Sequence, residues 1–269
     1  MRAQVKKFIV LGFILSVSAV SSAEFSIGVQ YWVCRLDLNH DLYDSQALAT
    51  ADGVFTPFFS VAVTKDFTLI GRVTVGNFYT RDEDYAHRGS LIQGKAHDRE
   101  VNLAVSYPCH SIITAQVNFS YRDFEFFRNY WTYDYVNTTY NHYELEARTA
   151  AFGVGAGVEI ISPRQFFWVK PFLNLGLSLL WSSCELQEEN LWEMTHNNTA
   201  GKRTIQDIEE SELYPALACE VGFRQNSATF PLSLELTFAV NQTYPSEENS
   251  FSEFYYGPQF KLRWTFGKN

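Results

Sequence analysis

The feature that most constrains this chain is an alternation of apolar and polar residues with a period of two, repeated along its length. Between Leu232 and Val240, leucine, phenylalanine and valine take every second position, and serine, glutamate, threonine and alanine take the positions between. Successive side chains of a β-strand point to opposite faces, so this pattern predicts strands with one apolar and one polar face. The chain is therefore expected to be an all-β protein.

Ten segments carry this pattern, and each is long enough to cross a lipid bilayer at a tilt. One contains the glycine-rich stretch "AFGVGAGVEII" (151–161), whose glycines alternate with apolar residues. A turn at 162–165 follows it instead of a helix, which favours a strand over a phosphate-binding loop. The predicted strands are 24–36, 54–65, 67–79, 98–107, 111–122, 148–161, 166–181, 212–224, 230–241 and 254–266.

The links between these strands alternate in length. Short links are predicted at 65–66, 108–110, 162–165 and 225–229, and long polar links at 37–53, 80–97, 123–147, 182–211 and 242–253. Membrane β-barrels have short turns at one end and long loops at the other, whereas a soluble sandwich has no reason to alternate its loops so regularly. The pattern predicts an antiparallel transmembrane β-barrel of about ten strands, with eight or twelve strands as alternatives. A soluble secreted β-sandwich that binds a ligand is the alternative fold.

Aromatic residues gather near both ends of the apolar faces, as expected of side chains that favour the boundary between hydrocarbon and headgroups. This placement supports a membrane-crossing wall over the aromatic core of a soluble β protein. The set at the end with short turns is predicted as Phe25, Phe67, Tyr107, Phe167, Phe230, Trp264 and Phe266, and the set at the end with long links as Phe55, Tyr79, Tyr121, Phe152, Trp181 and Phe254.

The last predicted strand, "FYYGPQFKLRWTF" (254–266), resembles the closing strand of bacterial outer-membrane β-barrel proteins. That resemblance implies short periplasmic turns, long extracellular loops, contact with outer-membrane lipid, and recognition of this strand by the barrel-insertion machinery. The residues 267–269 after the final aromatic depart from the family pattern. Pro57, Pro171 and Pro258 lie within predicted strands and are expected to mark bulges, because proline cannot donate a ladder hydrogen bond.

The N-terminal segment 1–23 has the form of a cleaved secretory signal, and 24–269 is expected to form the barrel. Arg2, Lys6 and Lys7 precede an apolar run that ends in small residues. Loss of these three cations would take the formal charge from −9 to −12, which argues against a nucleic-acid partner. The four cysteines lack metal-ligand spacing, and neither a metal nor a cofactor is predicted.

The polar faces carry charges of both signs that would be costly against lipid and can neutralise one another in a lumen. The hairpin around 225–229 is predicted to place Glu220 opposite Glu235, so a cation is expected between them, with Lys261 or Arg263 as the nearest candidates. The predicted lumen charges are Arg72, Glu100, Glu159, Lys170, Glu220, Arg224, Glu235, Lys261 and Arg263.

A ten-stranded barrel lies near the narrow end of the range, where side chains fill the lumen, so a wide pore is not expected. The remaining functions are surface interaction, as in an adhesin, or restricted permeation of small solutes. Tyr130, Trp131, Tyr133 and Tyr135 are the loop aromatics proposed to bind an extracellular ligand, unless they pack the loop over the barrel mouth. The acidic run between 185 and 212 is expected to be a solvated face, with weak divalent-cation binding as its alternative.

An enzymatic alternative comes from a partial resemblance to omptins, which are ten-stranded outer-membrane proteases. Asp82 and Asp84 match the acidic pair of that family in spacing and loop. Glu193 and His196 stand where the second pair is expected, but they lie three residues apart instead of two, and glutamate replaces aspartate. This departure favours a function that is not enzymatic and keeps the protease as an alternative.

Overall fold

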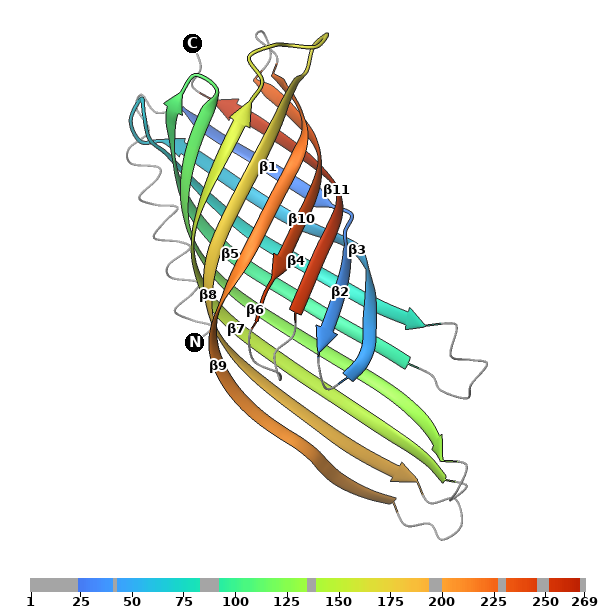
Figure 1. Ribbon diagram of the computed structural model, residues 1–269. Coiled ribbons are helices and arrows are strands. Elements are labelled where there is room, and N and C mark those ends of the chain that lie inside the picture. Colours follow the sequence, from blue (N-terminus) through green and yellow to red (C-terminus); the bar gives the residue numbers. More distant parts are fainter. Residues whose placement is uncertain are drawn as a thin grey trace.

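The computed structural model describes residues 24–40, 43–82, 92–134, 139–193, 200–226, 231–245 and 252–266. The predicted signal segment 1–23 lies outside these ranges. Within them, no helix is long and apolar enough to cross a membrane. The described chain consists of long strands joined by turns (Figure 1).

The strands form one closed antiparallel barrel with ten positions around its wall. Neighbours in sequence pair with each other, and β11 closes the barrel by pairing with β1 and β2, which both also pair with β3. The predicted all-β fold and the count of about ten strands are confirmed. The strands are β1 (Phe25–Trp32), β2 (Arg35–His40), β3 (Tyr43–Ala62), β4 (Thr68–Asp82), β5 (Ile92–His110), β6 (Ile113–Asp134), β7 (Thr139–Ile161), β8 (Lys170–Glu193), β9 (Ala200–Asn226), β10 (Leu232–Thr243) and β11 (Ser252–Phe266).

β1 and β2 are two parts of one barrel strand, interrupted at Val33 and Cys34. The interruption lies opposite Gly257 and Pro258 of β11, where the Val33 amide donates to the Pro258 carbonyl at 3.0 Å. Gly257 has φ of 153°, and a Cβ there would lie 2.1 Å from the Val33 carbonyl oxygen. The proline therefore coincides with an irregular point of the ladder, as expected, whereas Pro57 and Pro171 lie inside β3 and β8.

Three of the predicted long links, 37–53, 123–147 and 182–211, are mostly β-hairpins that continue the barrel wall. The predicted link 123–147 is occupied by β6 up to Asp134 and by β7 from Thr139, and the link 182–211 is likewise filled by β8 and β9. Hairpins of this length stand beyond the ends of β10 and β11 in Figure 1. The opposite end has short turns, as predicted, although β8 begins at Lys170 and residues 166–169 belong to the turn before it.

The outer wall is apolar across the middle of the barrel. Val154, Leu177 and Leu236 are 55%, 53% and 53% exposed, an arrangement that water would penalise and lipid would not. Aromatic rings meet at both borders of this band: Phe67 and Tyr107 at the turn end, 5.1 Å apart, and Tyr121 and Phe152 at the hairpin end, 4.9 Å apart. The structure thus shows the predicted aromatic borders, with Phe230 outside the described residues.

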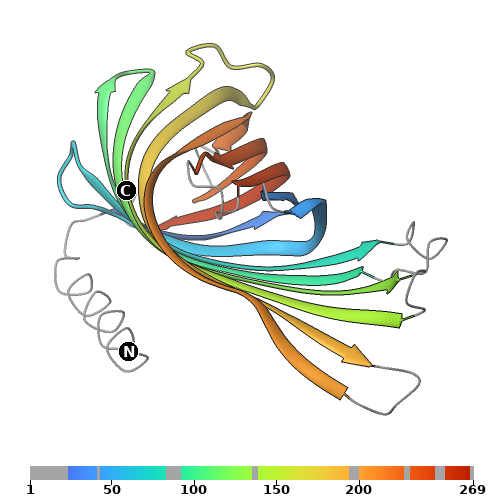
Figure 2. The same cartoon turned by 60° about the horizontal axis from the view of Figure 1, so that its bottom comes forward.

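Beyond the hairpin border the alternation reverses. Asp123 and Glu125 of β6 point outward, whereas Phe124 and Phe126 between them are buried at 1% and 2% exposure. The same reversal occurs on β2, β7 and β8, and these strands curve around a shared interior (Figure 2). The outer part of the lumen therefore holds an apolar core like that of a soluble protein. Its members are Trp32, Cys34, Leu36, Leu38, Val54, Phe78, Ala96, Phe124, Phe126, Leu145, Ala147, Leu186, Ala239 and Tyr255.

Candidate functional site

An ion network occupies the lumen near the turn end, centred on Glu235 of β10. Glu235 is 2% exposed and accepts hydrogen bonds from Arg224 Nε at 2.8 Å and Lys261 Nζ at 3.2 Å. Arg263 Nη2 lies 3.8 Å from the same carboxylate. Arg224 also forms a two-point contact with Glu159, at 3.1 and 2.6 Å. Charged side chains from four strands, β7, β9, β10 and β11, thus meet at this level of the lumen.

The predicted opposition of Glu220 and Glu235 is wrong. Glu235 faces Arg224 across the β9–β10 ladder, and Glu220 faces Ala239. The residue opposite Glu235 differs from the expected one by four positions, from Glu220 to Arg224. Because four is an even number, all these side chains still face the lumen, as the alternation predicts. Lys261 and Arg263, which had been expected as cations near this pair, contact Glu235 itself.

Aromatic rings fill the space around the network. The Arg224 guanidinium lies over Phe172 of β8, 4.7 Å from the ring centre. Phe58 of β3 reaches in from the other side, with Arg263 and Lys261 at 5.6 and 5.7 Å from its ring centre. Charges and rings therefore close this part of the lumen together.

A polar cavity of about 250 Å³ follows toward the hairpin end. Arg72, Glu100 and Glu220 line it, together with amide side chains such as Asn118 and Asn174. Asn174 Nδ2 donates to Glu220 Oε2 at 3.3 Å. Three of the predicted lumen charges thus face this cavity. Lys170 lies opposite Arg224 in the backbone register of β8 and β9.

A second charged cluster separates the cavity from the apolar core, and sequence reasoning missed it. Arg122 of β6 holds Asp98 of β5 at 2.8 and 3.0 Å and Glu253 of β11 at 2.5 Å. The Tyr255 hydroxyl donates to Asp98 at 3.1 Å and accepts a hydrogen bond from Arg122. Asp98 and Arg122 are terminal residues of predicted strands at positions that face the lumen, and this could have indicated the cluster. Glu253 had been assigned to a loop.

The apolar core lies directly on this cluster. The Tyr255 ring is 6.0 Å from Trp32 and 5.6 Å from Phe78, which is fully buried. Leu36 and Leu186 are 0% and 1% exposed. In the described part of the chain, the lumen is therefore divided into an ion network, a small cavity, a charged cluster and a dry core.

Charges of the outer surface begin just beyond the apolar band. Arg148 of β7 lies 3.4 Å from Asp123 and 3.9 Å from Glu125, and Arg99 of β5 lies 3.8 and 3.9 Å from the same carboxylates. Asp123 is the nearest charge and accepts a hydrogen bond from Arg148, and it raises the pKa of this guanidinium. The wall thus changes within two residues from apolar to ionic, which fixes the outer border of the band.

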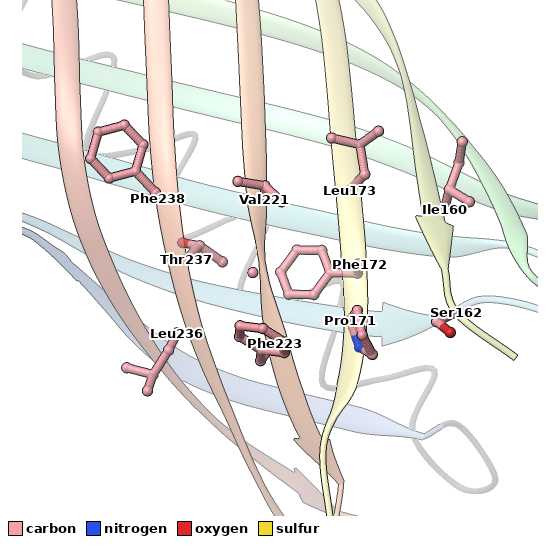
Figure 3. A pocket seen from close by; sticks show the side chains of 11 residues that line it. Ile160, Ser162, Pro171, Phe172, Leu173, Val221, Phe223, Leu236, Thr237 and Phe238 are labelled. Atoms are coloured by element: carbon pink, nitrogen blue, oxygen red, sulfur yellow. The ribbon is translucent and has the colours of Figure 1, made fainter. Parts of the chain in front are cut away.

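A shallow hollow of about 680 Å³ lies on the apolar outer wall, between β7 and β10 (Figure 3). Leu173, Val221, Leu236 and Phe238 are among its lining residues. Since it faces away from the lumen, it contributes nothing to a path through the barrel.

The predicted loop aromatics lie near the tip of the β6–β7 hairpin. Tyr130, Trp131 and Tyr133 belong to β6, and Tyr135 lies outside the described residues. The register places Tyr130 opposite Tyr143 and Tyr133 opposite Tyr140. The assignment of Tyr130, Trp131 and Tyr133 to a loop is therefore wrong, because their backbone pairs with β7.

The acidic run between 185 and 212 is divided between two faces by the strands that carry it. Glu185, Asp207 and Glu209 lie on the outer face, and Glu188 and Glu212 are buried at 5% and 8% exposure. Among the residues that the structure describes, no group of three acidic, histidine or cysteine side chains is arranged to hold a metal ion.

The omptin-like residues cannot be assembled into a site from the described chain. Asp82 is the last residue of β4 and Glu193 the last residue of β8, and the structure describes only the backbone of both. Asp84 and His196 lie outside the described residues. The protease alternative therefore gains no geometric support.

Comparison with known proteins finds no matching family model and no matching curated protein. Solved outer-membrane barrels do match. The translocator domain of the autotransporter NalP from Neisseria meningitidis is 8% identical, with 98% of this chain and 96% of that one covered and a TM-score of 0.52. The protease OmpT from Escherichia coli is 9% identical, with 91% and 97% covered and a TM-score of 0.46. Ail from Yersinia pestis is 10% identical, with 91% and 99% covered and a TM-score of 0.33. By its closed ten-stranded wall and this likeness, the chain has the fold of bacterial outer-membrane β-barrel proteins.

Proposed function

We propose that this chain is an outer-membrane protein whose closed barrel holds rigid β-hairpins at the cell surface, where they bind an extracellular partner. The observation that carries the proposal is the apolar core inside the outer part of the lumen. Leu36 and Phe78 are 0% exposed and Phe124 is 1% exposed, so water has no place between them. A path for ions or polar solutes needs a wetted lumen, and a dry core opposes it.

The hairpins support the surface part of the proposal. β6 and β7 remain paired from the apolar band to Asp134 and Thr139, and β8 and β9 remain paired to Glu193 and Ala200. Binding residues held on strands are positioned more rigidly than residues on loops. The cross-strand tyrosines near the β6–β7 tip would offer flat, amphipathic rings to a sugar or a protein surface.

The same proposal assigns two further partners. Outer-membrane lipid would surround the apolar band and fill the hollow near Leu173 and Val221 with acyl chains. The barrel-insertion machinery would recognise β11, whose outward residues end in Trp264 and Phe266.

Current through planar lipid bilayers tests the closed lumen. The folded protein is expected to give no current steps above those of bare lipid, with heat-dependent gel migration showing that the barrel is folded. A matched variant with Leu36, Phe78 and Phe124 replaced by serine should hydrate the core and raise the current if it still folds. Resolved current steps from the unaltered protein would establish permeation and defeat the proposal.

Labelling of intact cells tests the orientation. In a chain whose four cysteines are replaced by alanine, a cysteine at Glu209 on the outer face of β9 should react with a membrane-impermeant maleimide. A cysteine at Asp66, in the turn at the other end, should react only after the outer membrane is permeabilised. The reverse labelling pattern would place the hairpins inside the cell and contradict the proposal.

A further inference from the structure

Within the part of the chain that the structure describes, one long strand edge of the barrel has no partner strand. From Ala200 to Pro215, β9 pairs with β8 alone, because the β9–β10 ladder begins only at Ala216. Just after β10, the Tyr244 amide donates a hydrogen bond to the Pro215 carbonyl at 3.0 Å, and the described residues show no backbone hydrogen bond to this edge beyond it. No other strand of the described chain pairs with this edge, and the β8–β9 hairpin stands beyond the ends of β10 and β11 in Figure 1.

Such an edge can pair with another strand. Proteins usually shorten their edge strands, cover them or interrupt them with proline. Here the one proline, Pro215, lies where the free edge begins, and none follows toward the hairpin tip. A register irregularity occurs opposite Glu188 and Glu189, and the ladder then continues to Ala200. The free amide and carbonyl groups form a template for strand addition.

The charges along the edge identify the occupant. Its tip end is basic, with Lys202 and Arg203, and its barrel end is acidic, with Asp207 and Glu209 exposed on the outer face. Parallel pairing with an identical edge would align like charges, whereas antiparallel pairing aligns each basic half with an acidic half. We propose that the free edge of β9 pairs antiparallel with the same edge of a second copy of this chain.

A symmetric register exists for this pairing. A two-fold axis between Ile205 and Gln206 places Lys202 of each copy opposite Glu209 of the other and Thr204 opposite Asp207. In the β8–β9 ladder Lys202 is paired with Leu191 and Glu209 with Glu185, and Ile205 is left without a β8 partner, so Lys202 and Glu209 occupy equivalent backbone positions on either side of it. The contact is therefore self-complementary, as a two-fold interface requires.

The membrane sets the relative placement of the two copies. The two-fold axis of a continuous antiparallel strand pair is perpendicular to the sheet. The outer part of β9 continues the barrel wall past the border at Trp181 and Leu213, so an axis perpendicular to this wall lies in the plane of the membrane. A half-turn about it inverts the second copy. The paired edges therefore join proteins in two facing membranes and would hold together cells that both carry the chain. This step rests on the proposed function, which places the hairpins outside the cell.

Clustering of proteoliposomes, followed by light scattering, tests the inference with two charge-reversed variants. The first is Lys202→Glu with Arg203→Glu, and the second is Asp207→Lys with Glu209→Lys. Vesicles with the unaltered chain are expected to cluster, and vesicles with either variant alone are expected to stay dispersed. A mixture of the two variant vesicles should cluster again, because each reversed half then meets its opposite.

Clustering of the mixed vesicles would show that the single variants stay dispersed because of their charges and not because they fail to fold. Heat-dependent gel migration checks the folding of each variant independently. Dispersed vesicles of the unaltered chain, clustering of either variant alone, or a mixture that stays dispersed would overturn the inference. The maleimide labelling of Glu209→Cys cells is read separately. Failure of clustering with normal surface labelling would defeat the edge pairing and leave the proposed function standing.

Discussion

Replacement of Glu235 by glutamine is the perturbation whose cost follows most directly from the lumen geometry. Glutamine keeps the shape of the side chain and removes its charge, so Arg224, Lys261 and Arg263 lose the carboxylate that they share. Removal of one partner from a buried ion pair costs about 3–5 kcal/mol. Arg224 retains Glu159, and Arg263 is 31% exposed, so the lower end of about 3 kcal/mol is expected here. That free energy corresponds to about a 150-fold fall in the ratio of folded to unfolded protein.

Urea titration of the barrel in lipid vesicles, followed by heat-dependent gel migration at neutral pH, measures this loss. Glu220→Gln is the matched control, because Glu220 also lies in the lumen but has the neutral Asn174 as its hydrogen-bond partner at 3.3 Å. That control should lose about 1 kcal/mol or less. Equal losses in the two variants, or a loss of less than about 1 kcal/mol in Glu235→Gln, would refute the assignment of Glu235 as the centre of the network.

Two further pairs of variants test the packing. Phe124→Ala should lower the free energy of unfolding by about 3–5 kcal/mol, because the ring is 1% exposed inside the outer core. Phe152→Ala, on the lipid-facing wall, should lower it less. A larger loss for the Phe152 variant than for the Phe124 variant in the same urea titration would argue against an apolar core around Phe124. Gly222→Ala should reduce the yield of folded barrel, because the added Cβ would lie 2.2 Å from the Leu236 carbonyl oxygen. Gly176→Ala should be tolerated, since the atom nearest to its added Cβ would be 3.5 Å away. Equal yields of folded barrel for the two variants on the gel would contradict this prediction.

The part of the chain that lies in the apolar band could be predicted from sequence because the lipid imposes a sharp contrast between two faces. Leu173, Leu175, Leu177 and Leu179 must face outward and the polar residues between them inward, so the period of two is unambiguous. The lumen positions of charges such as Arg224 and Glu235 followed from the same alternation. The partner of Glu235 did not, because it depends on the length of a turn that alternation does not measure.

The hairpins were mistaken for loops because the pattern reverses beyond the membrane. In "ELEAR" (144–148) the apolar Leu145 and Ala147 face the lumen and the charged residues face outward, which is the order of a soluble protein. A search for apolar residues on the lipid face rejects such a segment, although its period is still two. The cluster of Asp98, Arg122 and Glu253 lies at this reversal, so its members were divided between predicted strands and a predicted loop.

The account depends on apolar side chains facing lipid and polar side chains facing the lumen, and a spin-label scan of β8 tests this most directly. Single cysteines placed in turn from Leu173 to Leu179, in a chain without its own cysteines, would carry a nitroxide label in lipid vesicles. Collision with oxygen, which concentrates in hydrocarbon, should be high at Leu173, Leu175, Leu177 and Leu179 and low at Asn174, Gly176 and Ser178. Collision rates that show no period of two, or that peak at the second set, would contradict the account.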